Sequence, residues 1–155
     1  MDQKPNIGLI DPHSSEAIEM MEALWIEIQT RYGFQAPNPM KSEHFIGPRY
    51  GFWIARAGRE TAGSVALVPW SESVAELDVM YVDPRFRRSG IASLLVEALE
   101  SFAKKEGFSF IRLRAGAPQP EALRFYEKQG YIRIESFGRW ASDDTAWCYE
   151  KKILD

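Results

Sequence analysis

The chain has 155 residues, of which 45% are hydrophobic, 26% charged and 13% aromatic, as in an ordinary globular protein. This length suits one hydrophobic core, and we expect residues 1–155 to form a single domain. The net charge of −3 and the isoelectric point of about 5.5 exclude a general electrostatic attraction to nucleic acid or to an anionic membrane.

Cysteine and histidine usage narrows the class of protein further. Cys148 is the only cysteine, so no intrachain disulfide can form, which fits a reducing compartment. The first residues hold no apolar run like that of a signal peptide, and no later run could span a bilayer. We therefore expect a cytoplasmic protein. His13 and His44 lie far apart and neither stands beside another typical ligand, so we expect no metal site.

The first third of the chain predicts a strand, a long helix and an irregular segment. Residues 6–10 have the pattern of a strand and are closed by an Asp-Pro turn. A helix is predicted from Ser15, where apolar residues begin to recur at helical spacing, and it ends at Gly33, because glycine commonly ends a helix. Residues 34–51 are rich in Pro and Gly, which predicts irregular structure with one short helix. The apolar face of the long helix comprises Ile18, Met21, Leu24, Trp25, Ile28 and Tyr32.

The rest of the chain alternates strands and helices. Strand patterns at 51–57, 61–70 and 74–82 are separated by connections short enough for antiparallel hairpins. The later predicted elements are a helix from Gly90 to Gly107, a strand at 108–115, a helix from Pro120 to Gly130, and strands at 131–137 and 145–154. The order β-α-(α)-β-β-β-α-β-α-β-β predicts an α/β fold whose mixed sheet is covered by helices on both faces.

An arginine-glycine turn precedes the second long helix. A helix begins with unpaired N–H groups and a partial positive charge, so its first turn favours an anion. Gly90 lets the backbone approach a ligand closely, and Ala92 is small. Arg87 and Arg88 add forked donors suited to phosphate oxygens. The segment of Arg87, Arg88, Ser89, Gly90, Ile91 and Ala92 therefore predicts a cradle for a diphosphate group.

Other interpretations of this turn are less favoured. No Walker sequence occurs in the chain, and only one of the three glycines of the dinucleotide-binding fingerprint is present. Binding of a nucleic-acid backbone by Arg85, Arg87 and Arg88 is disfavoured because nothing basic extends the patch. A solvated run of charges followed by an ordinary glycine turn is the remaining alternative.

Two sequence motifs resemble those of a known family. Residues 87–92 match the [QR]-x-x-G-x-[GA] acetyl-CoA loop of the GNAT superfamily of N-acetyltransferases. Residues 119–131, QPEALRFYEKQGY, resemble the second signature of that superfamily, A-x-x-[FL]-Y-x-x-x-G-[FY]. The chain is thus similar to a small, bacterial-type, single-domain GNAT enzyme. The likeness covers about residues 51–155, and the N-terminal third agrees in pattern only.

The resemblance implies a binding place for acetyl-CoA. In this superfamily the cosubstrate lies between two parallel strands that splay apart, which correspond here to 74–82 and 108–115. The splay would leave backbone groups of Met80 and Val82 for the pantetheine arm, and N–H groups near Met80 for the oxyanion. Gln119 stands where many relatives carry a polar residue that touches the pantetheine.

The resemblance also implies a general base. An alkylammonium has a pKa near ~10.4 and no lone pair, so the acceptor must lose a proton before it attacks. Glu76 holds the position of a family general base, and Asp78 is an equal candidate. Two solvent-facing strand carboxylates are the alternative. Strand alternation places Glu76, Asp78 and Met80 on one face, opposite Leu77, Val79 and Tyr81.

Tyr126 matches the tyrosine that members of the superfamily often place beside the sulfur of the cosubstrate. The pKa values of ~8.5 for a thiol and ~10 for a phenol make full proton transfer to the thiolate uphill by roughly 2 kcal/mol. Replacing Tyr126 with phenylalanine should therefore slow turnover rather than abolish it. The alternative is a core tyrosine on an amphipathic helix.

The chain departs from the superfamily pattern near the site. Similar relatives often have ELKRMYV where this chain has ELDVMYV, and an acidic residue and threonine where it has Arg114 and Ala115. Analogy therefore does not identify the acceptor. The acceptor-binding segments of the superfamily correspond to 32–50 and 137–147. Aromatic residues that could line such a pocket, although core packing explains each of them equally well, are Tyr32, Phe34, Trp53, Trp140 and Trp147.

We expect an N-acetyltransferase that moves the acetyl group of acetyl-CoA to a primary amine of a small-molecule or amino-acid-like acceptor. The acidic balance of the chain favours a cationic amine. A protein lysine or N-terminus is an alternative acceptor. A longer acyl group in place of acetyl and a homodimeric assembly are also compatible with the sequence. A catalytically silent acyl-CoA sensor would keep the turn and lose turnover, but the presence of Glu76 and Tyr126 favours the enzyme.

Overall fold

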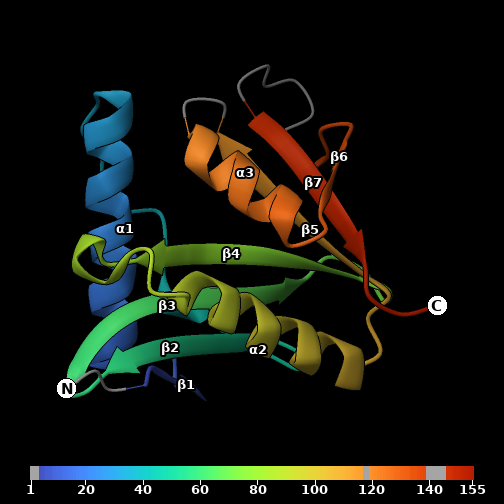
Figure 1. Ribbon diagram of the computed structural model, residues 1–155, viewed down its shortest axis with the longest axis horizontal. Helices are drawn as coiled ribbons and strands as arrows, with labels where there is room; N and C mark the ends of the chain where they lie inside the picture. The colour runs from blue at the N-terminus through green and yellow to red at the C-terminus, as the bar shows by residue number, and fades with distance from the viewer. Residues whose placement is uncertain (1–3, 117–118, 139–145) are drawn as a thin grey trace.

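The computed structural model describes residues 4–116, 119–138 and 146–155. Within these ranges, seven strands form one mixed sheet in the order β1-β2-β3-β4-β5-β7-β6 (Figure 1). β2, β3 and β4 are antiparallel neighbours, which confirms the two predicted hairpins. The strands are β1 Asn6–Leu9, β2 Gly51–Ala57, β3 Glu60–Pro69, β4 Val74–Val82, β5 Phe110–Gly116, β6 Ile132–Ile134 and β7 Ala146–Lys152.

Helices connect the strands in the predicted order. α1 begins after Ser14, whose hydroxyl accepts a hydrogen bond of 3.2 Å from the Ala17 N–H, and it ends at Gly33, which has a φ of 71°. Only the short turn η2 was not predicted. No helix of the described ranges combines the length and the apolar character that crossing a membrane requires. The helices are α1 Ser15–Tyr32, α2 Ile91–Lys105 and α3 Pro120–Lys128, with 3-10 turns η1 Ser42–Phe45 and η2 Pro84–Phe86.

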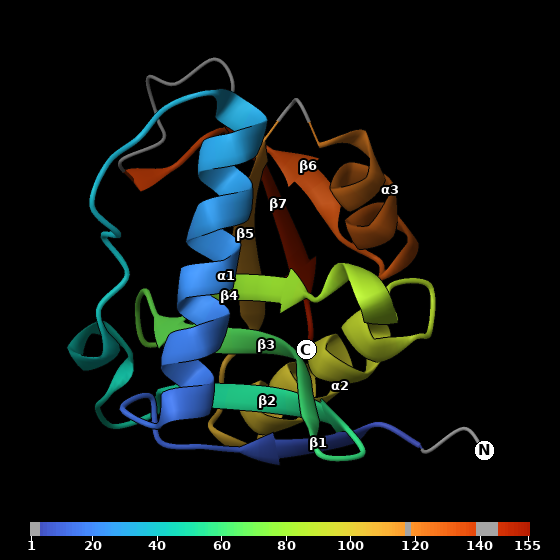
Figure 2. The ribbon, with the colours of Figure 1, turned by 90° about the vertical axis from the view of Figure 1, so that its left-hand side faces the viewer.

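The helices cover both faces of the sheet, as predicted. α1 lies in front of the strands in Figure 2, where Met20 packs with Ile54 of β2 in one hydrophobic cluster. α2 and α3 pack on the opposite face, where Leu95 and Leu123 belong to a second cluster. The apolar face predicted for α1 is only partly a core face, because Ile18 is 44% exposed.

β4 and β5 are parallel neighbours that separate after three pairs of residues. The paired residues are Val74 with Phe110, Ala75 with Ile111, and Glu76 with Arg112. Figure 1 shows β5 turning away from β4 beyond these pairs. The splay predicted between these two strands is therefore confirmed. It leaves residues 77–82, all of which the structure describes, without a strand partner on the β5 side.

The middle of β4 carries a β-bulge. Ser64 of β3 pairs with Tyr81 and Ala66 pairs with Asp78, so two residues of β4 stand opposite one residue of β3. Val79 lies in the bulge with a φ of 54°, which is uncommon for a β-branched residue. The fully buried Ser64 Oγ donates a hydrogen bond of 2.8 Å to the Val79 carbonyl. This buried hydrogen bond stabilises the bulge.

The bulge corrects the alternation predicted for β4. Leu77 and Met80 both pack on the α2 face, whereas Val79 and Tyr81 pack on the α1 face. The extra residue shifts the phase of the strand by one, so the later side chains exchange faces. Strict alternation had predicted that Met80 shares a face with Asp78. That prediction is wrong, because Met80 lies on the opposite face.

Candidate active site

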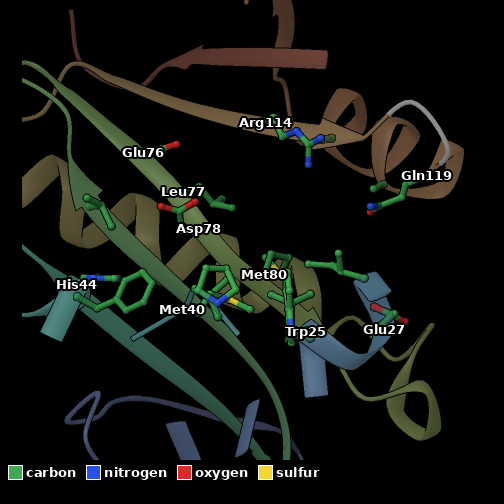
Figure 3. Close-up of a pocket in the computed structure, with 18 of the residues that line it drawn as sticks. Trp25, Glu27, Met40, His44, Glu76, Leu77, Asp78, Met80, Arg114 and Gln119 are labelled. Atoms are coloured by element: carbon green, nitrogen blue, oxygen red, sulfur yellow. The ribbon is translucent and has the colours of Figure 1, made fainter. Parts of the chain in front are cut away.

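A cavity of about 660 Å³ lies where β4 and β5 separate (Figure 3). Its walls include residues of α1 and η1, which cover one face of the sheet, and residues of α3, which lies on the other face. The cavity therefore passes through the splay between the two strands. Its volume falls within the range that small-molecule sites occupy.

Five of the twelve predicted site residues meet at this cavity. Glu76, Asp78 and Met80 reach it from β4, Gln119 from the residue before α3, and Tyr126 from α3. Val82 and the turn residues 87–92 do not line it, because they lie at and beyond the far end of β4. The predicted site thus has two parts, a cavity and a turn, and the second half of β4 connects them.

Tyr126 is buried in the wall of the cavity. Its ring packs edge-on against Phe125 and Tyr131, with centroid distances of 5.1 and 5.9 Å. Burial raises the pKa of the Tyr126 hydroxyl, and the negative charge of Asp78 raises it further. Tyr126 therefore keeps its proton at neutral pH and can donate it in a hydrogen bond. Asp78 is close enough to act on this proton electrostatically.

Charged and polar side chains reach the cavity from several elements. Figure 3 shows Glu76 and Asp78 on β4 and Arg114 on β5, on the two sides of the splay. The polar groups of this region thus come from both of the strands that separate. The sequence had marked Arg114 only as a departure from the superfamily pattern, and the structure places it in the cavity wall.

The end of α1 and the start of α3 are joined beside the cavity. The Gln119 Nε2 donates a hydrogen bond of 3.2 Å to the Tyr32 hydroxyl. The Arg31 guanidinium and the Glu121 carboxylate form an ion pair at 2.9 Å. These two contacts fix Gln119, one of the predicted site residues, against the helix on the other side of the splay.

The arginine-glycine turn presents open amide groups at the start of α2. Gly90 is the residue before the helix and has a φ of 84° in the left-handed region. No side chain caps this end, and the first turn contains no acidic residue. The N–H groups of residues 91–93 have no acceptor within the helix. An added Cβ at Gly90 would meet nothing within 4 Å, so the approach to these donors is clear. The turn therefore offers hydrogen-bond donors that an anionic group can reach.

The arginines of the turn have different surroundings. Arg85 is exposed and bound to two carboxylates, at 3.2 Å from Asp83 and 3.0 Å from Glu60. The Arg87 Nε donates a hydrogen bond of 2.9 Å to the Val82 carbonyl, and the same guanidinium forms an ion pair with Glu27 of α1. Glu27 also lines the cavity, and sequence reasoning had not identified it. It links the turn to the cavity wall.

The aromatic residues of the cavity differ from those predicted. Trp53 is a core residue that packs against Phe102, and Trp147 packs against Arg133. Phe34 packs against Trp25 and does not itself line the cavity, and Tyr32 holds Gln119 beside the cavity. Trp140 lies outside the described residues. The aromatic residues that do line the cavity are Trp25, Phe45, Trp70, Tyr126 and Phe137.

Comparison with known proteins identifies the class of enzyme to which this fold belongs. The model of the acetyltransferase (GNAT) family matches residues 17–131, and the chain belongs to this family. It is therefore an acetyl-CoA-dependent acyltransferase.

Two N-acetyltransferase sequences are similar to this chain over different shares of their length. The IAA acetyltransferase of Azospirillum brasilense is 24% identical over 152 residues, which cover 96% of this chain and 99% of that protein. The human N-acetyltransferase 8 is 32% identical over 85 residues, which cover 52% of this chain but only 37% of that protein. The chain therefore matches a little over a third of the length of the human relative.

Solved structures share the fold across nearly the whole chain. A protein from Klebsiella pneumoniae, assigned as an acyl-CoA N-acyltransferase, has a TM-score of 0.81 at 24% identity and covers 97% of this chain and 98% of its own. An aminoglycoside 6′-N-acetyltransferase, solved in complex with coenzyme A, has a TM-score of 0.77 at 16% identity, with coverages of 97% and 98%. At these identities the likeness establishes the fold.

Proposed function

We propose that this enzyme transfers the acetyl group of acetyl-CoA to the primary amine of a small molecule, by direct attack of the amine on the thioester. One observation carries this proposal: Asp78 and Tyr126 act on each other in a cavity that passes between β4 and β5. A proton acceptor and a proton donor thereby lie together at the gap between the strands. Acyl transfer to an amine needs one group that accepts a proton from the amine and one group that donates to the leaving thiolate.

The cosubstrate would extend from the turn into the cavity. Its pyrophosphate binds the open amides at the start of α2, with charge from Arg87 and Arg88. The unpaired edge of β4 then leads from the turn to the cavity, so backbone groups of Val82 and Met80 can pair with the pantetheine arm. An N–H group near Met80 would stabilise the oxyanion of the tetrahedral intermediate.

The side chains of the cavity supply the proton transfers. Asp78 or Glu76 accepts a proton from the ammonium form of the acceptor, which gives the nitrogen its lone pair. The nitrogen attacks the thioester carbon, and the oxyanion re-forms the carbonyl as the bond from carbon to sulfur breaks. The second proton of the attacking nitrogen passes to the leaving thiolate through solvent, which gives the amide and the free thiol. Tyr126 then donates to the leaving thiolate. Because its pKa is raised, Tyr126 assists mainly by hydrogen bonding rather than by full proton transfer.

The cavity walls favour a small acceptor over a polypeptide. Met40 and His44 of the segment after α1 border the cavity, together with Trp70 and Phe137. The rings of Trp70 and Phe137 meet edge-on with centroids 5.5 Å apart, so these two distant segments converge there. Such walls suit an acceptor that enters the cavity whole. A protein lysine or N-terminus is the competing acceptor.

Release of coenzyme A tests the proposal. The enzyme should hydrolyse acetyl-CoA slowly, and a small primary amine should accelerate the release of the thiol, with the acetylated amine identified by mass spectrometry. Acceleration by lysine-containing peptides but by no small amine would show that the acceptor is a protein. Tight coenzyme A binding without acceleration by any amine or peptide would contradict the transfer reaction.

A further inference from the structure

Asp78 and Arg114 occupy matching positions on the two splayed strands. The last β4–β5 pair includes Glu76, and Asp78 stands two residues after it, just as Arg114 stands two residues after the partner of Glu76 on β5. The intervening Leu77 and Leu113 pack in the core with α2, so Asp78 and Arg114 both lie on the opposite face. They therefore face the α1 side of the sheet, from opposite sides of the gap.

Arg112 and Arg114 lie on the same face of β5 but have different neighbours on β7. Arg112 is paired in register with Glu150, and its Nε donates a hydrogen bond of 2.6 Å to that carboxylate. The residue in register with Arg114 is the buried Cys148. Arg114 lines the cavity and Arg112 does not. In Figure 3 the Arg114 side chain extends from β5 toward the cavity.

The α1 side of the cavity carries several apolar groups beside the charged Glu27 and Arg31. Ring and thioether groups from α1, from the segment up to η1, and from the ends of two hairpins line the space that Asp78 and Arg114 face. They provide room for a hydrophobic group. These residues are Trp25, Met40, Phe45, Trp70 and Phe137.

A carboxylate on one strand, a guanidinium on the other and an apolar wall beside them match the groups of one class of molecule. An α-amino acid carries its ammonium and its carboxylate on the same carbon atom, with the side chain as the third group. A guanidinium binds a carboxylate through two parallel hydrogen bonds, which fixes the orientation of the ligand. Asp78 lies by Tyr126, so the ammonium end is the end that reaches the thioester.

From the facing positions of Asp78 and Arg114 across the splay, we infer that the acceptor is a zwitterionic α-amino acid with an apolar side chain, whose carboxylate binds Arg114. This inference rests on the proposed function and narrows its acceptor class. Arg114 then distinguishes the amino acid from simple amines. A purely structural alternative is that Arg114 offsets the charges of Glu76 and Asp78.

Matched acceptors separate these possibilities. The wild-type enzyme is assayed with the twenty common amino acids and, for each active one, with its amide and with the amine that lacks the carboxyl group. We expect Arg114→Gln to lower kcat/KM for the amino acid by about 100-fold, the effect of losing charge-assisted hydrogen bonds. The same variant should change kcat/KM for the amine by no more than about threefold. Each comparison of a variant with the wild type is made within one acceptor, so differences in amine pKa cancel there.

Two further variants control for the fold and for charge. Arg112→Gln removes the neighbouring guanidinium outside the cavity and should leave the preference for the carboxylate unchanged. Arg114→Lys keeps the charge without the fork and should retain an intermediate preference. Calorimetric binding of coenzyme A verifies that each variant is folded.

The outcomes distinguish the inference from the proposed function. Equal loss with all acceptors in Arg114→Gln would show that Arg114 acts on the β4 carboxylates, and it would overturn the inference alone. Equal wild-type activity toward the amino acid and its decarboxylated amine would also overturn the inference and leave the proposed function intact. Absence of turnover with every small amine and amino acid would overturn the proposed function and the inference with it.

Discussion

Glu27 of α1 and Arg87 of the arginine-glycine turn form an ion pair across 60 residues of sequence. Arg87 is held at a second point, because its Nε donates a hydrogen bond to the Val82 carbonyl. The Glu27 carboxylate therefore stands beside a guanidinium that we propose to bind pyrophosphate. A carboxylate at this place competes for the donors of Arg87 and adds negative charge close to an anion site.

Removing this carboxylate should tighten the binding of coenzyme A. We expect Glu27→Gln to lower the dissociation constant by roughly 1.5-fold to fivefold, the range that exposed ion pairs reach. The gain should shrink as salt is raised, because screening weakens both charges. Titration calorimetry at low and high salt measures both effects. Glu19→Gln removes an exposed carboxylate elsewhere on α1 and serves as control. Weaker binding in Glu27→Gln would mean that Glu27 positions Arg87 for the phosphate.

Gly90 should matter for ligand binding more than for stability. Gly90 and Gly107 flank α2 with φ of 84° and 87°, and an added Cβ at either would meet nothing within 4 Å. Both alanine variants should therefore lose about 1–2 kcal/mol of stability in urea, from backbone strain alone. Only Gly90→Ala places a methyl group at the approach to the open amides. We expect about a tenfold weaker affinity for coenzyme A in that variant, and no change in Gly107→Ala. Equal affinities would contradict the phosphate cradle.

Tyr126 should contribute to turnover without being indispensable. We expect Tyr126→Phe to lower kcat at saturating substrate by roughly tenfold to 100-fold, the effect of losing one hydrogen bond to a charged sulfur. Tyr131→Phe is the matched control, because Tyr131 is buried beside Tyr126 but lies outside the cavity lining. It should keep its kcat. Unchanged turnover in Tyr126→Phe would remove Tyr126 from the mechanism.

Local sequence was enough to predict the turn and most of the elements. The Arg-x-x-Gly-x-Ala segment is contiguous with the strand before it and the helix after it. A single sequence motif therefore predicts this strand-turn-helix unit. The bounds of α1 follow from Ser14 and Gly33, whose residue types serve as helix caps. The splay of β4 from β5 followed from the resemblance to the family. These features depend on short-range chemistry or on a motif that spans few residues.

The remaining features depend on contacts between distant segments. Nothing in the sequence of β4 marks a bulge at Val79, because its left-handed backbone is held by Ser64 of another strand. Helical periodicity likewise placed Trp25 on the apolar face of α1 but did not indicate that the second half of this helix borders the cavity. An apolar residue has the same pattern whether it packs on a sheet or overhangs a pocket. For the same reason the sequence left Trp53 open between a pocket wall and the core, and the structure places it in the core.

Tyr131 contributes to the response of the stability of the fold to alkaline pH. Its hydroxyl donates a hydrogen bond of 3.0 Å to the Glu100 carboxylate, which also binds Lys151 at 3.0 Å. Burial and the charge of Glu100 raise the pKa of Tyr131, so the folded state keeps a proton that the unfolded state releases above about pH 10. Stability should therefore decline as pH rises above 10. Tyr131→Phe should be less stable at pH 8 but should lose less between pH 8 and 11, as urea midpoints would show. Parallel declines in both proteins would contradict this assignment.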